Sequence, residues 1–80
     1  MIAVKAQYFA AFRDRVGRAS EELQTSAKTA GDLYAEIAAM HGFADTAATC
    51  KVAINDEFAT WDTPLNDGDT VLFFPPVAGG

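Results

Sequence analysis

The sequence is poor in cysteine, in positively charged residues and in long apolar segments. Its one cysteine, Cys50, cannot form a disulfide within the chain, so nothing requires an oxidising compartment. Six lysines and arginines stand against eleven acidic residues, for a net charge of −5. This balance argues against nucleic-acid binding, which requires clustered cations. The longest run without a polar residue, Val71 to Gly80, is far shorter than the roughly 20 residues that cross a bilayer. We therefore expect a soluble, cytoplasmic protein that binds neither nucleic acid nor membrane.

The length and composition indicate one small globular domain. Eighty residues leave no room for a second core. Half of the residues are hydrophobic and 21% are charged, which is typical of a folded rather than a disordered chain. We divide the chain into a domain, residues 1–74, and an extended C-terminal tail, residues 75–80, that ends in Gly-Gly.

The first half predicts a strand, a short helix, a second strand and a longer helix. Apolar residues alternate from Ile2 to Tyr8, which favours a half-buried strand. From Ala10 to Val16 the spacing becomes helical, and Gly17 favours the end of that helix. A weaker strand signal covers Glu21 to Thr25, and the clearest helix spans Ala30 to His41.

The longer helix carries signals at both ends. Thr29, followed by Asp32 three residues later, predicts a capping box, in which each side chain accepts a hydrogen bond from a backbone N–H. Gly42 is expected to end the helix in the left-handed conformation. The apolar residues of one face predict a stripe that packs across a sheet: Leu33, Ile37 and Met40.

The second half returns to the alternation of strands. Residues 52–54 alternate, a tight turn at 55–57 leads into a run at 58–61, and turn residues fill 64–69. Thr70 to Phe74 is apolar on both faces, so we expect it to be a central strand. The order strand–strand–helix–strand–strand predicts an α+β fold of the β-grasp type, with a mixed sheet of four to five strands around one main helix.

The C-terminal tail is the most distinctive segment. Pro75 and Pro76 end the last strand, because proline has no backbone N–H and a fixed φ, and two adjacent prolines favour an extended conformation. The residues after them are small: Val77, Ala78, Gly79 and Gly80. Such a tail is suited to carrying the terminal carboxylate of Gly80 into a partner protein. A carboxylate must be activated before it transfers, so we expect an ATP-dependent partner that forms an acyl-adenylate.

Three segments resemble the family of molybdopterin synthase small subunits, which are ubiquitin-related sulfur carriers. They are the C-terminal segment 73–80 (FFPPVAGG), the preceding segment 64–71 (PLNDGDTV), and Tyr8-Phe9-Ala10 with the following Arg13 and Gly17. The resemblance spans essentially the whole chain. One departure is that Ala78 stands where relatives often have Ser or Thr.

The resemblance implies a β-grasp fold and a role for Gly80. In this family an E1-like adenylating enzyme activates the last glycine with ATP, and the glycine then becomes a thiocarboxylate. Its sulfur is delivered to a pyranopterin precursor in the large subunit of the synthase during molybdenum cofactor synthesis. The catalytic residues belong to those partners, so the resemblance implies that this chain alone is no enzyme and binds no cofactor. It also matches Phe9, Phe58 and Phe74 to the hydrophobic positions through which the family docks its large subunit. The alternative is that one or more of these rings fill the core.

Two other residues carry reactive groups but no motif. Cys50 lacks a second cysteine, and lone cysteines are usually packing residues. His41 ends the longer helix, where a positive charge is favoured, and no other ligand stands at a spacing that predicts a metal site.

Other functions remain open at this point. A ubiquitin-like modifier would join Gly80 to lysines of target proteins after the same activation. A sulfur carrier for the thiazole of thiamine would use the same glycine, although such chains generally lack the Phe-Phe-Pro-Pro segment. A plain interaction module would tolerate loss of the last residue.

Overall fold

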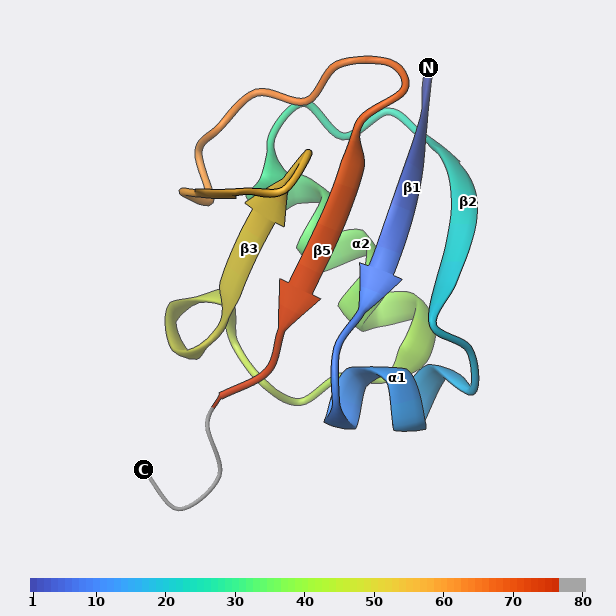
Figure 1. The fold of residues 1–80 in the computed structure, drawn as a ribbon, viewed down its shortest axis with the longest axis vertical. Coiled ribbons are helices and arrows are strands. Elements are labelled where there is room, and N and C mark those ends of the chain that lie inside the picture. Colours follow the sequence, from blue (N-terminus) through green and yellow to red (C-terminus); the bar gives the residue numbers. More distant parts are fainter. Residues whose placement is uncertain (77–80) are drawn as a thin grey trace.

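The computed structural model describes residues 1–76 and contains one mixed five-stranded sheet (Figure 1). The elements are β1 (Ile2–Tyr8), α1 (Ala11–Val16), β2 (Ser20–Thr25), α2 (Ala30–His41), a 3-10 turn η1 (Ala47–Thr49), β3 (Lys51–Ile54), β4 (Glu57–Ala59) and β5 (Thr70–Phe74). The strand order is β2-β1-β5-β3-β4, so β5 is central as predicted. The β1–β5 pair is parallel and the other three pairs are antiparallel.

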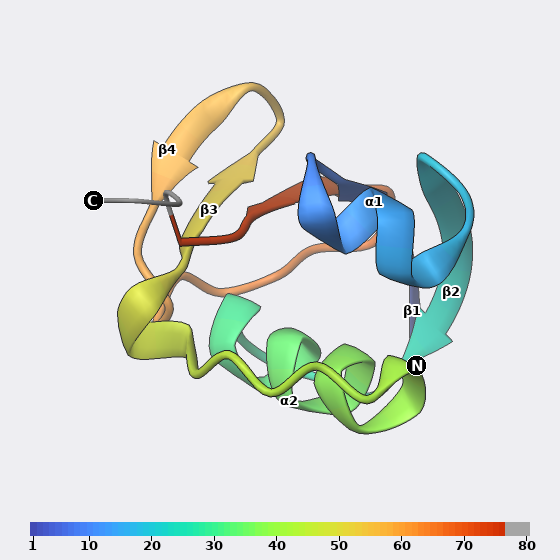
Figure 2. The same cartoon turned by 90° about the horizontal axis from the view of Figure 1, so that it is seen from below.

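One face of the sheet packs on α2, which lies across it (Figure 2). The core lies between these two layers, because alternate residues of each strand point toward the helix. Its buried side chains come mainly from β1, α2 and β5: Val4, Ala6, Tyr8, Leu33, Tyr34, Ile37, Val71 and Phe73. The predicted α+β fold, with a mixed sheet around one main helix, is confirmed.

The buried face of α2 differs from the predicted stripe in one residue. Leu33 and Ile37 are fully buried, but Met40 is 51% exposed, so its assignment to the stripe is wrong. Tyr34 is buried instead. Because successive residues turn by about 100° around a helix axis, a buried face that includes Tyr34 is rotated away from Met40. The same rotation brings His41 toward the sheet.

The N-terminus of α2 forms half of the predicted capping box. The Thr29 hydroxyl accepts a hydrogen bond from the backbone N–H of Asp32 at 3.2 Å. The Asp32 carboxylate accepts from the N–H of Lys28 at 3.4 Å rather than from that of Thr29. Gly42 ends the helix at a φ of 72°, as expected.

The β3–β4 hairpin turns on Asn55 and Asp56, which have φ values of 52° and 71°. Positive φ at both central residues is the requirement of a type I′ turn, and Asn and Asp tolerate it better than most residues. The following strand, β4, ends at Ala59, so the predicted run to Trp61 is too long. The Trp61 ring instead packs against Tyr34, at 5.2 Å between ring centroids.

Candidate functional site: an aromatic groove at the end of the central strand

Three aromatic side chains meet where β5 ends. The parallel pairing of β1 with β5 places Phe9, which follows β1, beside Phe74, the last residue of β5. The backbone N–H of Phe9 donates to the carbonyl of Phe73 at 3.2 Å, which extends this pairing. The Phe74 ring lies 5.3 Å from that of Phe9 and 5.6 Å from that of Phe58 on β4. These contacts join three segments that lie far apart in the sequence.

The three rings line a hollow of about 430 Å³, which we call the aromatic groove. It is lined by Phe9, Ala10, Ala11, Lys51, Phe58, Phe74, Pro75 and Pro76. Phe58 is 79% exposed and Phe9 is 54% exposed, whereas Phe74 is half-buried. None of the three rings belongs to the buried core. A concentration of exposed aromatic rings on a small domain is typical of a protein-binding surface.

The alternation of β5 explains why Phe74 reaches the groove. Val71 and Phe73 are fully buried against α2, and Leu72 and Phe74 point to the opposite face of the sheet. The prediction that neighbouring Phe73 and Phe74 face opposite sides is confirmed.

A tight turn fixes the backbone that carries Phe9. The N–H of Phe12 donates to the carbonyl of Phe9 at 3.1 Å, and Ala10 within this turn has φ 51° and ψ −120°. These angles suit glycine better than alanine. Phe12 is fully buried and its ring stacks on Phe43, with 4.4 Å between centroids. Packing of Phe12 therefore holds the turn, and the turn holds Phe9 at the edge of the groove.

The predicted tail begins at the groove. Pro75 and Pro76 line it directly after β5 ends at Phe74. The remaining predicted tail residues, Val77, Ala78, Gly79 and Gly80, lie outside the described residues. Docking through the three rings and chemistry at Gly80 thus stay predictions.

Comparison with known proteins identifies the family. The family model described as ThiS family matches residues 6–80. The chain belongs to the ThiS family. It is 35% identical over 80 residues to the molybdopterin synthase sulfur carrier subunit of Escherichia coli, covering 96% of this chain and 99% of the relative. It is 38% identical over 82 residues to the subunit of that name from Chlamydomonas reinhardtii, covering 96% and 98%. The resemblance inferred from the three sequence segments is confirmed.

Solved structures agree with this assignment. A Pyrococcus furiosus protein, assigned as subunit 1 of molybdopterin converting factor, is 33% identical, with a TM-score of 0.80 over 96% of this chain and 100% of that one. A chain of the complex of subunits 1 and 2 of this factor from Helicobacter pylori matches at 26% identity and TM-score 0.66, over 99% of this chain and 100% of that one. Small archaeal modifier protein 1 of Haloferax volcanii, at 22% identity and TM-score 0.78 over 98% and 99%, shares the fold.

Cys50 of this ThiS-family chain is buried and has polar neighbours. Its side chain is 3% exposed, and its sulfur lies 3.8 Å from the Tyr34 hydroxyl and 3.9 Å from that of Thr49. Burial, together with the hydrogen bond to Cys50, raises the pKa of Tyr34 above its ordinary value. The thiol belongs to the buried core and is not among the residues that line the aromatic groove.

A carboxylate joins the end of α2 to the edge of the sheet. Glu21 accepts hydrogen bonds from the Tyr8 hydroxyl at 2.5 Å and pairs with Nε2 of His41 at 2.7 Å. Burial tends to raise the pKa of Glu21, but the hydrogen bonds with Tyr8 and His41 outweigh it and lower this pKa below its ordinary value. Burial and the same bond raise the pKa of Tyr8. His41 is thereby part of a structural network.

Within residues 1–76 no three His, Cys, Asp or Glu side chains form a group that could hold a metal ion.

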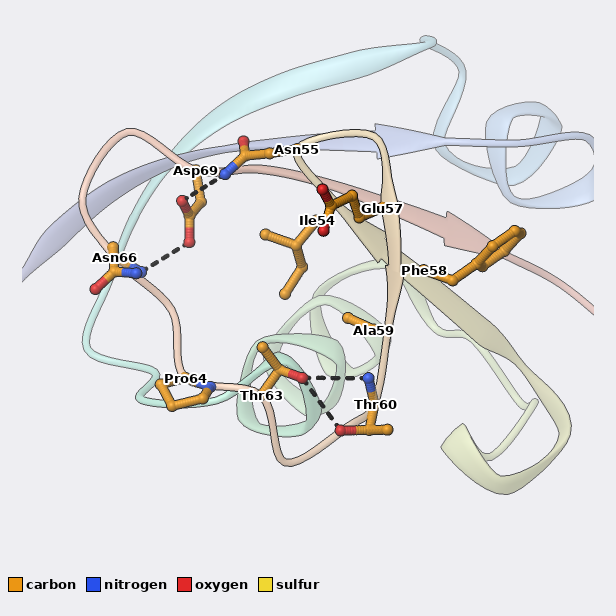
Figure 3. Close-up of a pocket in the computed structure, with 10 residues that line it drawn as sticks. All are labelled: Ile54, Asn55, Glu57, Phe58, Ala59, Thr60, Thr63, Pro64, Asn66 and Asp69. Atoms are coloured by element: carbon orange, nitrogen blue, oxygen red, sulfur yellow. Dashed lines mark hydrogen bonds between the residues drawn. The ribbon is translucent and has the colours of Figure 1, made fainter.

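A second hollow, of about 460 Å³, lies between the β3–β4 hairpin and the loop that precedes β5 (Figure 3). Asp69 accepts hydrogen bonds there from the side chain of Asn55 at 2.9 Å and from the backbone N–H of Asn66 at 2.8 Å. The Phe58 ring points away from it. The bond from Asn55 joins the loop to the hairpin and the bond from Asn66 lies within the loop, so we assign this region a structural role. No helix in the described part of the chain is long and apolar enough to cross a membrane.

Sequence reasoning did not identify Lys51 or Ala10 as groove residues. Lys51 lines the groove because it lies opposite Phe74 in the β3–β5 pairing, which no local pattern reveals. The conformation of Ala10 also gave no signal, because alanine rarely adopts a positive φ.

Proposed function

We propose that this chain is the sulfur carrier subunit of a molybdopterin synthase and that the carboxylate of Gly80 carries the sulfur. The observation on which the proposal rests is the position of the aromatic groove, which Pro75 and Pro76 line directly before the C-terminal residues. A partner that docks in this groove contacts the chain beside the segment that carries the reactive end. Relatives that bear the name of this subunit support the proposal.

In the proposed reaction an E1-like enzyme first activates the C-terminus with ATP. The Gly80 carboxylate attacks the α-phosphorus of ATP, pyrophosphate leaves, and an acyl-adenylate forms. Sulfide supplied by a donor then attacks the acyl carbon, AMP leaves, and the product is a thiocarboxylate. Glycine suits both steps because its carbonyl is unhindered and its backbone passes through a narrow channel. In this proposal ATP is bound by the activating partner and this chain binds no cofactor.

The large subunit of the synthase is the proposed acceptor. The thiocarboxylate sulfur attacks a carbon of a pyranopterin precursor and displaces an oxygen substituent from that carbon. Water then cleaves the acyl–sulfur bond, which leaves the sulfur on the precursor and restores the Gly80 carboxylate. The Helicobacter pylori structure of subunits 1 and 2 in one complex supports a two-subunit assembly. The catalytic residues belong to the partners, and this chain contributes a sulfur-donating end and a docking surface.

A modifier that joins Gly80 to lysine side chains is the second candidate. It uses the same adenylate and therefore the same C-terminus. The archaeal modifier protein shares the fold at 22% identity, a level that does not distinguish the two functions. A carrier for thiazole synthesis is a third candidate. The fate of Gly80 separates a carrier from a modifier, since a carrier forms a thiocarboxylate and a modifier forms an isopeptide bond.

Intact mass spectrometry tests the proposal. The purified chain is incubated with the adenylating enzyme, ATP and a sulfide donor. The mass should rise by the difference between sulfur and oxygen, and fragmentation should assign the gain to Gly80. Deletion of Gly80 should abolish the gain, and Cys50→Ser should not. Sulfur that maps to Cys50 and survives deletion of Gly80 would contradict the proposal, and conjugates to lysine without a thiocarboxylate would favour the modifier.

A further inference from the structure

Lys51 stands apart from the other residues of the aromatic groove by its charge. It begins β3 at the end of the sheet where β5 ends (Figure 1), and it lies opposite Phe74 in the antiparallel pairing of these strands. Its side chain is exposed. Among the described residues that line the groove, it is the one charged residue, and the others are alanines, phenylalanines and prolines.

The charge of Lys51 is opposite to that of the chain as a whole. The chain carries a net charge of −5, and no acidic residue lines the groove in the part that the structure describes. The two ion pairs within residues 1–76 are Arg15–Asp45 and Glu21–His41. Neither includes Lys51. The groove therefore presents a local positive charge on an acidic protein.

A partner that covers the three rings must also accommodate this ammonium group. If the partner is apolar around Lys51, the ammonium loses water without gaining a counter-charge, which is costly. If the partner carries a cation there, the two charges repel. A carboxylate of the partner at the rim of the contact compensates the ammonium group for its lost hydration. It attracts the ammonium group and leaves the apolar contact of the rings undisturbed. The flexible stem of lysine allows the charge to stay at this rim while its methylene groups pack on apolar neighbours.

We propose that Lys51 is a specificity residue of the groove, which selects a partner surface that carries an apolar side chain for the three rings and a carboxylate beside it. The inference rests on the proposed function, and the partner to which it commits is the large subunit of the synthase. Phe9, Phe58 and Phe74 supply the apolar contact, and Lys51 determines which apolar surface fits. Because the chain as a whole is acidic, the effect is local pairing at the groove and not long-range attraction.

Titration calorimetry with the full chain and the purified large subunit tests this inference. Lys51→Glu should raise the dissociation constant by about tenfold or more, because it places a like charge opposite the partner's carboxylate. Lys51→Met, which keeps the length and removes the charge, should weaken binding less and should reduce its dependence on salt concentration. Thermal unfolding of each variant checks that the fold is intact.

Lys28→Glu is the matched control. Lys28 is exposed and lies between β2 and α2, at the opposite end of the sheet from the groove (Figure 1). The Lys28→Glu substitution changes the net charge by the same amount as Lys51→Glu. Because its site is far from the groove, it should leave binding nearly unchanged. Equal losses from the two charge reversals would mean that net charge acts, and would overturn the inference. Binding of Lys51→Glu as tight as that of the wild type would also overturn it.

The outcomes separate this inference from the proposed function. A wild-type chain that binds the large subunit and acquires sulfur on Gly80, with Lys51→Glu unchanged in binding, would refute the role of Lys51 alone. A wild-type chain that neither binds nor acquires sulfur would refute both. If the isolated chain forms dimers that Lys51→Glu disrupts, the carboxylate belongs to a second copy, and the assignment to the large subunit is wrong.

Discussion

The ring centroid of Phe9 lies 5.3 Å from that of Phe74, across the parallel pair of β1 and β5. Parallel strands have their C-terminal ends at the same edge of a sheet, so the residues that follow β1 and end β5 are neighbours. The topology thus brings Phe9 beside the start of the C-terminal tail. Phe58 completes the groove from β4, on the other side of Phe74.

The exposure of Phe58 predicts that it serves binding and not folding. Phe58→Asp should leave thermal unfolding nearly unchanged, because the ring is 79% exposed in the free chain. The same change should weaken binding to the large subunit by roughly 30-fold or more, since it removes an aromatic anchor and places a charge in an apolar contact. Met40→Asp is the matched control, because Met40 is another exposed apolar residue, on α2. Unfolding of Phe58→Asp, or equal binding losses for both variants, would count against the docking surface.

The backbone of Ala10 predicts an unusual response to glycine. Its φ of 51° and ψ of −120° lie outside the regions that alanine favours, at a cost on the order of 1–3 kcal/mol. Glycine removes this strain. It also makes the unfolded chain more flexible, which lowers the free energy of unfolding by about 0.5–1 kcal/mol. Ala10→Gly should therefore keep or raise the free energy of unfolding measured with urea. Ala35→Gly, at an exposed position within α2, should lower it by about 1 kcal/mol. Equal destabilisation by both substitutions would show that Ala10 is unstrained.

The Glu21 network predicts a loss of stability in acid. The pKa of Glu21 is lower in the folded chain than its ordinary value of 4.5. A carboxyl group with a lowered folded pKa stabilises the fold above the unfolded pKa, and this contribution disappears as the pH falls through the folded pKa. Glu21→Gln should therefore reduce the free energy of unfolding at pH 7 by about 1–2 kcal/mol, and the difference from the wild type should shrink below about pH 4.5.

Glu22→Gln provides the control for this pH dependence, because Glu22 is the exposed neighbour of Glu21 on β2. It should change stability little at any pH. A difference between wild type and Glu21→Gln that stays constant from pH 7 to pH 3 would mean that the ionisation of Glu21 does not stabilise the fold.

Most of the fold could be predicted from the sequence because the signals are local. Alternation defined β1, and the Thr29 cap with Gly42 defined both ends of α2. The errors arose where position depends on packing. Met40 has the spacing of a buried residue but lies outside the face that Tyr34 helps to define.

The groove could be predicted only in part. Its three rings followed from resemblance, whereas the approach of Lys51 depends on the register between β3 and β5. Register is fixed by tertiary pairing, and no pattern within either strand reports it.

The two prolines that line the groove predict that stiffness aids sulfur transfer. Each proline restricts the chain before binding, so the C-terminal tail should lose less entropy when a partner binds it. Replacing both Pro75 and Pro76 with glycine should lower kcat/KM for sulfur transfer by roughly tenfold. Each proline reduces the entropic free-energy cost of ordering the tail by about 0.4–1 kcal/mol, and the two effects add. The measurement is the steady-state rate of sulfur transfer, with the large subunit at limiting concentration and the thiocarboxylated chain as substrate.

The control for this substitution is Pro64→Gly, in the loop that precedes β5, where Pro64 bridges to Thr29. It should alter the free energy of unfolding but not the transfer rate, because Pro64 does not line the groove. The double glycine variant should show the opposite pattern, since Pro75 and Pro76 follow the last strand and make no bridge within the sheet. Transfer rates that are equal for the wild type and the double variant would mean that the tail's stiffness has no role, and that the prolines serve only to end β5.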